Sequence, residues 1–182
     1  MIISTRIAER LTPGFLKKRE LNKLFDVVAS AFGSVAPPTT DLSYPESLAL
    51  FAKFTAMETA KALERHADIE SIRNLLYQGA YDFGMKFRKQ WGISDTSEVM
   101  EVGRMLYGFL GIEFNGSSEG RIEITKCMFA DYYSAQTCRM ISSLDEGMMA
   151  GLSAGGTLAF SQRITEGFHS CRAHFTPKEQ SS

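Results

Sequence analysis

The sequence lacks the features that mark membrane, exported and nucleic-acid-binding proteins. No stretch approaches 18 consecutive apolar residues, which argues against a membrane span. The first eleven residues, MIISTRIAERL, have no long apolar core and include Glu9, so we expect no secretory signal there. Twenty basic residues balance 21 acidic ones, and the longest basic run is the triplet at residues 17–19. This charge pattern offers no electrostatic footprint for nucleic acid.

Cysteine is scarce, and its spacing does not suggest a metal site. Cys127, Cys138 and Cys171 are an odd number of thiols with wide spacings, and there is no Cys-x-x-Cys or His-x-x-x-His pair. Without an export signal, we expect reduced thiols in a cytoplasmic protein. Three thiols with Asp145 or a histidine could in principle bind tetrahedral zinc. Because the paired spacing is missing, we predict no metal and no cofactor.

The amino-terminal part of the chain has the pattern of helices. At 182 residues, with 44% hydrophobic content, the chain has the size of one domain with a substantial core, so we treat 1–182 as a single domain. Ser43 with Glu46, and Asp95 with Glu98, have the spacing of capping boxes. Residues 1–110 are predicted to be mainly helical, with helices at about 12–33, 43–65, 68–91 and 95–109.

The pattern changes in residues 111–176, where a sheet and one helix are predicted. Two β-like runs flank the turn-forming cluster at 115–120. A helix over 137–152 ends before Gly155 and Gly156, and two more strands follow at 157–164 and 170–176. We therefore expect an α+β fold, in which N-terminal helices precede an antiparallel sheet of two hairpins, with the intervening helix packed on it.

The predicted helix TCRMISSLDEGMMAGL has a carboxylate on its apolar face. On a helical wheel Asp145, seven residues after Cys138, falls near the centre of the face that Ile141, Met148 and Leu152 share. Burying an unpaired carboxylate costs several kcal/mol, so Asp145 must be paired, protonated or functional. An ion pair with Arg163 or Arg172 would satisfy it without any catalytic role, and both interpretations stay open.

The thiols raise the same choice between packing and chemistry. Strand alternation places Cys171 on one face and Arg172 on the other, and it places Cys127 opposite Ile124. Buried cysteine is most often simple core, whereas a nucleophilic thiol needs a neighbouring base or cation. The candidates close in sequence to Cys171 are His169, His174, Arg163 and Arg172.

These motifs together resemble the L-2-amino-thiazoline-4-carboxylic acid hydrolase family and, more distantly, the 4-vinyl reductase domains. The similar features are a strand ending in Cys127, a helix with Cys138 and Asp145, and a final hairpin that contains Cys171. They cover about 50 to 60 residues of the carboxy-terminal third. The family often has a second helical cysteine where this chain has Ser142.

The resemblance implies hydrolytic opening of a thiazoline ring to N-carbamoyl-L-cysteine. The catalytic residues that it implies are Cys138, Asp145, Cys171 and Cys127, and the expected substrate-binding residues are Arg163, Arg172 and His169. Two alternatives remain: a binding module like the 4-vinyl reductase domains, without catalysis, and a scaffold whose cysteines are core. The expected partner is a small molecule, with a homodimer as a further possibility. A hydrolase predicts that Asp145 and the thiols meet at a cavity with an arginine or histidine.

Overall fold

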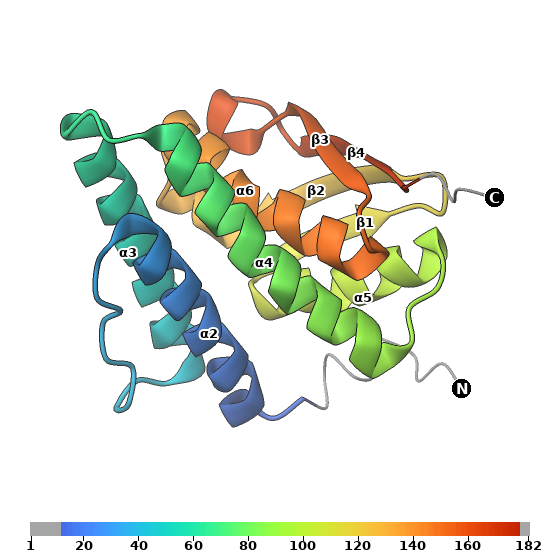
Figure 1. Cartoon of the computed structure of the whole chain (residues 1–182), viewed down its shortest axis with the longest axis horizontal. Helices are drawn as coiled ribbons and strands as arrows, with labels where there is room; N and C mark the ends of the chain where they lie inside the picture. The colour runs from blue at the N-terminus through green and yellow to red at the C-terminus, as the bar shows by residue number, and fades with distance from the viewer. Residues whose placement is uncertain (1–11, 179–182) are drawn as a thin grey trace.

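The chain forms an α+β fold in which helices precede a four-stranded antiparallel sheet, as predicted (Figure 1). The computed structural model describes residues 12–178, so the expectation about a secretory signal in residues 1–11 lies outside the described part. The helices are α2 (Gly14–Phe32), α3 (Tyr44–Glu64), α4 (Ile69–Trp91), α5 (Thr96–Phe109) and α6 (Ala135–Ser153). The strands are β1 (Ile112–Gly116), β2 (Arg121–Cys127), β3 (Thr157–Gln162) and β4 (Cys171–Thr176), with the short 3₁₀ helices η1 (Met128–Asp131) and η2 (Ile164–Glu166) after β2 and β3.

The helix ends mostly follow the capping signals in the sequence. Ser43 and Glu46 form the predicted capping box, in which the Glu46 carboxylate accepts a hydrogen bond of 2.7 Å from the Ser43 amide. In the second predicted box, the Asp95 carboxylate accepts a hydrogen bond of 2.9 Å from the amide of Glu98, and the Glu98 carboxylate accepts one of 2.7 Å from the amide of Ser94. The box therefore includes one residue more than the sequence pattern indicates.

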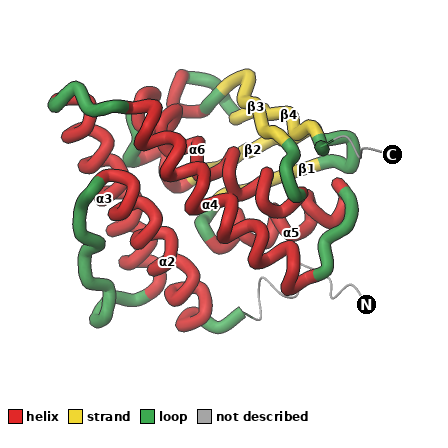
Figure 2. Tube along the Cα trace, viewed as in Figure 1, coloured by secondary structure: helices red, strands yellow, loops and turns green. Residues whose placement is uncertain are grey.

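The sheet consists of the two predicted hairpins, joined edge to edge in the order β1-β2-β4-β3 (Figure 2). All of its neighbouring strands are antiparallel. In β4 the alternation is regular, because Cys171, Ala173 and Phe175 are buried and the residues between them are exposed. The sheet thus has an inner face that belongs to the core and an outer face that is open to solvent.

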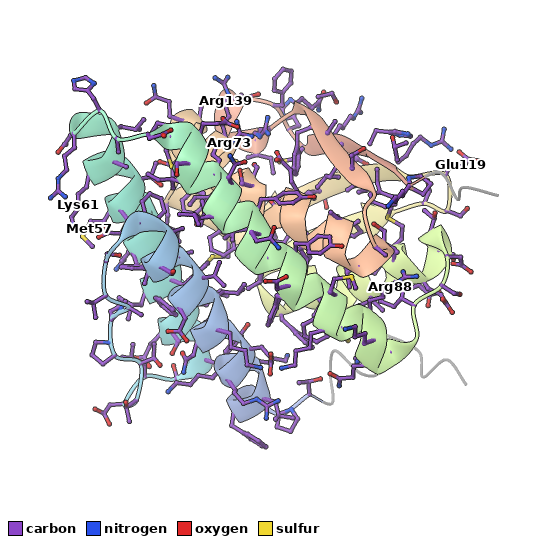
Figure 3. All side chains as sticks on the ribbon, in the orientation of Figure 1. Met57, Lys61, Arg73, Arg88, Glu119 and Arg139 are labelled. Carbon is purple, nitrogen blue, oxygen red and sulfur yellow. The ribbon has the colours of Figure 1, made fainter. Side chains whose placement is uncertain are left out.

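Helix α6 lies on the inner face of the sheet, and α4 packs along α6 (Figure 1). The two helices approach closely because glycine faces backbone at their contact. A Cβ atom at Gly147 would overlap the carbonyl oxygen of Tyr77, and one at Gly151 would overlap that of Tyr81. Two arginines of α4, both labelled in Figure 3, hydrogen-bond to α6: Arg73 to the Ser143 hydroxyl at 3.1 Å, and Arg88 to the Leu152 carbonyl at 2.9 Å.

The remaining helices close the core beside this pair. Helix α5 packs on β1, and α2 packs on α3 and α4. The rings of Phe25 and Phe51 meet edge to face at 5.0 Å, and Phe51 also contacts Phe129 at the end of the sheet. Within residues 12–178, no helix combines the length and the apolarity that crossing a membrane requires.

We expect Gly147→Ala to destabilise the protein by about 2 kcal/mol or more, because the added methyl group forces α4 and α6 apart. The measurement is the free energy of unfolding from urea titration. Gly103→Ala on α5 is the matched control, because its Cβ would only reach ordinary contact with Phe114 and Met149, at 3.6 to 3.7 Å. Equal stabilities of the two variants would contradict the close-packing argument.

Candidate functional site

A cavity of about 110 Å³ lies between α6, the inner face of the sheet and the helices beyond. Its size is of the order of engineered apolar cavities that bind benzene, which are about 150 Å³. Most of its lining is aliphatic and aromatic. The exceptions include Asp145, Arg163 and all three cysteines of the chain, Cys127, Cys138 and Cys171. These polar residues therefore come from three separate elements, α6, β2 and β4, and from the connection between β3 and β4, and they meet at one cavity.

Helix α6 contributes Cys138 and Asp145 to this cavity from a single face. Their separation of seven residues is two helical turns, and Ile141, Ser142 and Met148 line the cavity beside them. The helix begins at Ser134, whose hydroxyl accepts a hydrogen bond of 3.1 Å from the Thr137 amide. The Ser142 hydroxyl donates to the Cys138 carbonyl at 2.7 Å, so it is satisfied within the helix.

A β-bulge turns Cys127 into the cavity. Glu113 pairs with Lys126 and Phe114 pairs with Ile124, which leaves Thr125 as an extra residue in β2. Beyond the bulge, Cys127 lies on the same face as Ile124. The prediction from regular alternation, which placed Cys127 opposite Ile124, is therefore wrong, and the extra residue is the reason.

A second bulge has the same effect on Arg163. Phe160 pairs with the buried Ala173, and Gln162 pairs with the exposed Arg172, so that Ser161 is the extra residue in β3. Gln162 therefore shares the outer face with Arg172, and the following residue, Arg163, lines the cavity. Each hairpin thus delivers one polar side chain to the cavity through an irregularity in its ladder.

Asp145 is held by a single hydrogen bond from a buried tyrosine. The Tyr107 hydroxyl on α5 donates to Asp145 Oδ1 at 2.9 Å, and the Tyr107 ring stacks on Phe114. Burial raises the pKa of Asp145 from its ordinary 3.8 to about 7, although the Tyr107 hydrogen bond and the Arg163 charge act in the opposite direction. The carboxyl group is therefore poised to gain or lose a proton near neutral pH.

The three thiols remain protonated near neutral pH. Burial raises the pKa of Cys127 to about 12, and it also raises the pKa values of Cys138 and Cys171 above their ordinary range. The Cys171 sulfur accepts a hydrogen bond of 3.3 Å from the Ile164 amide, which opposes the effect of burial only in part. All three cysteines are free thiols. None of them has the low pKa of an activated nucleophile.

Arg163 has a buried hydrogen-bond donor that the described part of the chain does not use. Its side chain is only 14% exposed, and its guanidinium lies 4.6 Å from the centre of the Phe160 ring. Its Nη1 is 3.9 Å from Glu166, and that carboxylate is engaged more closely by Arg139 at 2.8 Å. Among the described residues, the buried Nε of Arg163 has no hydrogen-bond partner.

The structure does not bring Arg172 and His169, two of the expected substrate-binding residues, to the cavity. Arg172 is 63% exposed on the outer face of the sheet, where it lies 3.7 Å from Glu123. His169 is exposed in the connection before β4. The reason for Arg172 is strand alternation, since its neighbour Cys171 faces inward. The alternative in which Asp145 is satisfied by an ion pair with Arg163 or Arg172 is not observed among the described residues, where Asp145 accepts a hydrogen bond from Tyr107.

Sequence reasoning missed Tyr107 and Tyr133, which also line the cavity. Tyr107 lies on the buried face of the predicted helix 95–109, and a buried tyrosine hydroxyl requires a partner. The need of the Tyr107 hydroxyl for a partner was therefore the signal in the sequence that could have identified Tyr107. Tyr133 follows η1, and its hydroxyl lies 2.5 Å from that of Thr55 on α3. No comparable signal in the sequence joins those two residues.

The site has no arrangement that would bind a metal ion. Across residues 12–178, no group of three or more histidine, cysteine, aspartate or glutamate side chains is placed to hold one. Besides several hydroxyl groups, the polar part of the cavity includes a carboxyl group that titrates near neutrality, an arginine whose Nε has no partner in the described chain, and three neutral thiols. Such a set can exchange protons with a bound molecule and hold an anionic group.

Comparison with known proteins adds information on the fold alone. No family model and no curated protein matches the chain. A similar solved structure is that of a trafficking protein particle complex subunit 3 from Naegleria fowleri, covalently bound to palmitic acid. The two chains are 15% identical with a TM-score of 0.53, over 74% of this chain and 97% of that chain.

We expect Asp145→Asn to be more stable than the natural protein at pH 8. Because folding raises the pKa of Asp145 from 3.8 to about 7, its contribution to stability is full below pH 3.8 and is lost as the pH rises through 7. The loss is about 4 kcal/mol. Asparagine retains an acceptor for Tyr107 and does not titrate.

The check is the free energy of unfolding of both proteins between pH 4 and pH 8. The difference between them should grow in favour of Asp145→Asn across this range. A difference that is independent of pH would show that Asp145 keeps its ordinary pKa.

Proposed function

We propose that the chain is a small hydrolase that opens a cyclic amidine-like C–N/C–S bond, with 2-amino-thiazoline-4-carboxylate as the reference substrate. The observation that carries the proposal is the presence of Asp145 and Arg163 in one cavity of about 110 Å³. The substrate has a basic amidine at one end, suited to a carboxylate, and a carboxylate at the other, suited to a guanidinium. The site would act in the cytoplasm, where the three free cysteines stay reduced.

In this proposal water is the nucleophile, because neutral thiols are poor ones. Asp145, as carboxylate, takes a proton from the water as its oxygen adds to the ring carbon between nitrogen and sulfur, and it passes that proton to the ring nitrogen. The new hydroxyl then gives up its proton through Asp145 as the C–S bond breaks and the sulfur leaves with the bonding pair. Sulfur receives this proton, and N-carbamoyl-L-cysteine results. Arg163 holds the substrate carboxylate, and the three thiols complete the walls.

Release of free thiol from 2-amino-thiazoline-4-carboxylate, followed with and without a chelator, tests the proposal. We expect chelator-insensitive turnover. Asp145→Asn should lower kcat by about 100-fold or more, which is the usual contribution of general acid–base catalysis. Arg163→Gln should chiefly raise KM, whereas Arg172→Gln is the matched control on the outer face and should leave both constants unchanged. Cys138→Ser should lose less activity than Asp145→Asn.

The proposal fails if the natural protein releases no thiol, or if Asp145→Asn retains full activity. Activity abolished by Cys138→Ser, with Asp145→Asn unaffected, would assign the chemistry to the thiol instead.

Tyr107 is proposed as the positioning residue for Asp145, and it has a distinct signature in the pH profile. As Asp145 must be ionised to accept a proton, activity should rise with pH through about 7. Tyr107→Phe removes a hydrogen bond that lowers the pKa of Asp145, so the midpoint of the profile should move to higher pH. A lower rate with an unchanged midpoint would mean that Tyr107 acts only through packing.

A second candidate function is the binding of a small apolar molecule without turnover. Two observations favour it: most of the cavity lining is apolar, and the similar trafficking-complex subunit is described as covalently bound to palmitic acid. Intact-mass measurement of the purified protein, before and after hydroxylamine, tests the covalent form of this second function. A thioester-linked acyl group would appear as added mass that hydroxylamine removes, whereas the hydrolase predicts the unmodified chain.

A further inference from the structure

The cavity is chemically divided between elements that lie apart in the fold. Its unused cationic group, Arg163, belongs to the connection between β3 and β4, and η2 in this connection packs on α6. Its apolar lining includes Leu24 on α2, Phe51 on α3 and Leu106 on α5. Helix α2 packs on α3 and α4. The lining from the β3–β4 connection is called the charged end of the cavity below, and the lining from α2, α3 and α5 is called its apolar end.

The charged end is suited to a planar anion. Arg163 has a buried Nε without a partner in the described chain, and the Glu166 carboxylate, 3.9 Å from its Nη1, is engaged more closely by Arg139. Phe160 lies against the guanidinium and restricts its orientation. An arginine held in this way, with donors unused, matches the geometry of a carboxylate.

The lining at the apolar end is mostly hydrocarbon, and the hydroxyls of Tyr107 and Tyr133, which also line the cavity, already have partners in Asp145 and Thr55. Leu24, Phe51 and Leu106 are each buried, as is Ala80 on α4, which lines the same end. A hydrophilic molecule confined to the charged end would leave this surface in contact with water. An apolar group placed there gains about fourfold in affinity for each methylene that leaves water.

We propose that the substrate of this site is a monocarboxylate with a small apolar substituent, its carboxylate on Arg163 and its substituent among Leu24, Phe51 and Leu106. This inference rests on the proposed function, because it assigns a substrate class to the same cavity. It goes further by disfavouring the unsubstituted thiazoline as the best substrate. It also requires that the substituent be no larger than a ring, given the cavity of about 110 Å³.

The test begins with calorimetric binding to the full chain, using acetate, propionate, butyrate, pentanoate, hexanoate and benzoate. Benzyl alcohol and benzylamine serve as uncharged and cationic matches for benzoate. Affinity should rise about fourfold per methylene and then fall once the cavity is full. Benzoate should bind more tightly than both of its matches by at least about tenfold, which is the scale of a charge-assisted hydrogen bond.

Variants of the lining residues show which residues bind the carboxylate of the ligand and which bind its apolar substituent. Arg163→Gln should abolish the preference for benzoate over benzyl alcohol, and Arg172→Gln should retain it. Ala80→Leu should shorten the longest acid that binds, and Leu106→Ala should lengthen it. If either core variant fails to fold, as judged by circular dichroism, the ligand series on the natural protein still decides. Affinity that is independent of chain length, equal binding of acid and alcohol, or no binding of any acid would overturn the proposal.

Turnover separates this inference from the proposed function. Relative to 2-amino-thiazoline-4-carboxylate, its 5-methyl and 5,5-dimethyl derivatives should show kcat/KM raised by about fourfold per methyl group. If the unsubstituted compound is turned over and the methyl derivatives show no gain, the inference about the apolar substituent is wrong, and the proposed hydrolase function is retained. If the affinity for the acids depends on chain length but no compound is turned over, the proposed hydrolase function is wrong, and the inferred ligand class is retained.

Discussion

The architecture depends on the close contact between α4 and α6. Gly147 and Gly151 let the backbone of α6 reach the carbonyl oxygens of α4, and arginines of α4 hold both ends of the contact. This contact fixes how α6 is rotated over the sheet. The opposite side of the helix, with Cys138 and Asp145, then faces the inner surface of the strands, and the cavity is the space that remains between them. A site built on a rigidly packed helix keeps its geometry better than one on loops.

The electrostatic character of the cavity follows from the small number of polar groups that contact its ionisable side chains. Asp145 has one hydrogen bond from Tyr107, and the charge of Arg163 lowers its pKa only in part, so burial dominates and the carboxyl group titrates near neutrality. The same burial keeps the thiols protonated. In the proposed reaction, proton exchange is therefore assigned to the carboxyl group, and the sulfur atoms contribute a polarisable and neutral wall.

Much of the fold could be predicted from local sequence signals. The helices, the two hairpins and the inward face of β4 follow from capping residues, turn clusters and periodicity, which act over a few residues. The position of Asp145 on the inward face of α6 follows from the same periodicity. Its partner could not be predicted in this way, because Tyr107 lies 38 residues away and the pair forms only when α5 packs beside α6. Arg163 and Arg172 were equal candidates in the sequence, and only the strand register distinguishes them.

The two bulges determine which polar groups of the sheet face the cavity. Each hairpin contains one residue more than a regular ladder can pair, at Thr125 and at Ser161. Loss of either residue, or insertion of one more beside it, would give an even spacing between the inward residue before the bulge and Cys127 or Arg163, so regular alternation would keep that side chain inward. Loss of a bulge without a change in chain length would instead turn the thiol or the guanidinium toward solvent. During divergence, these two strands could therefore change by one residue in either direction without losing the cavity's polar groups, but could not become regular at their present length.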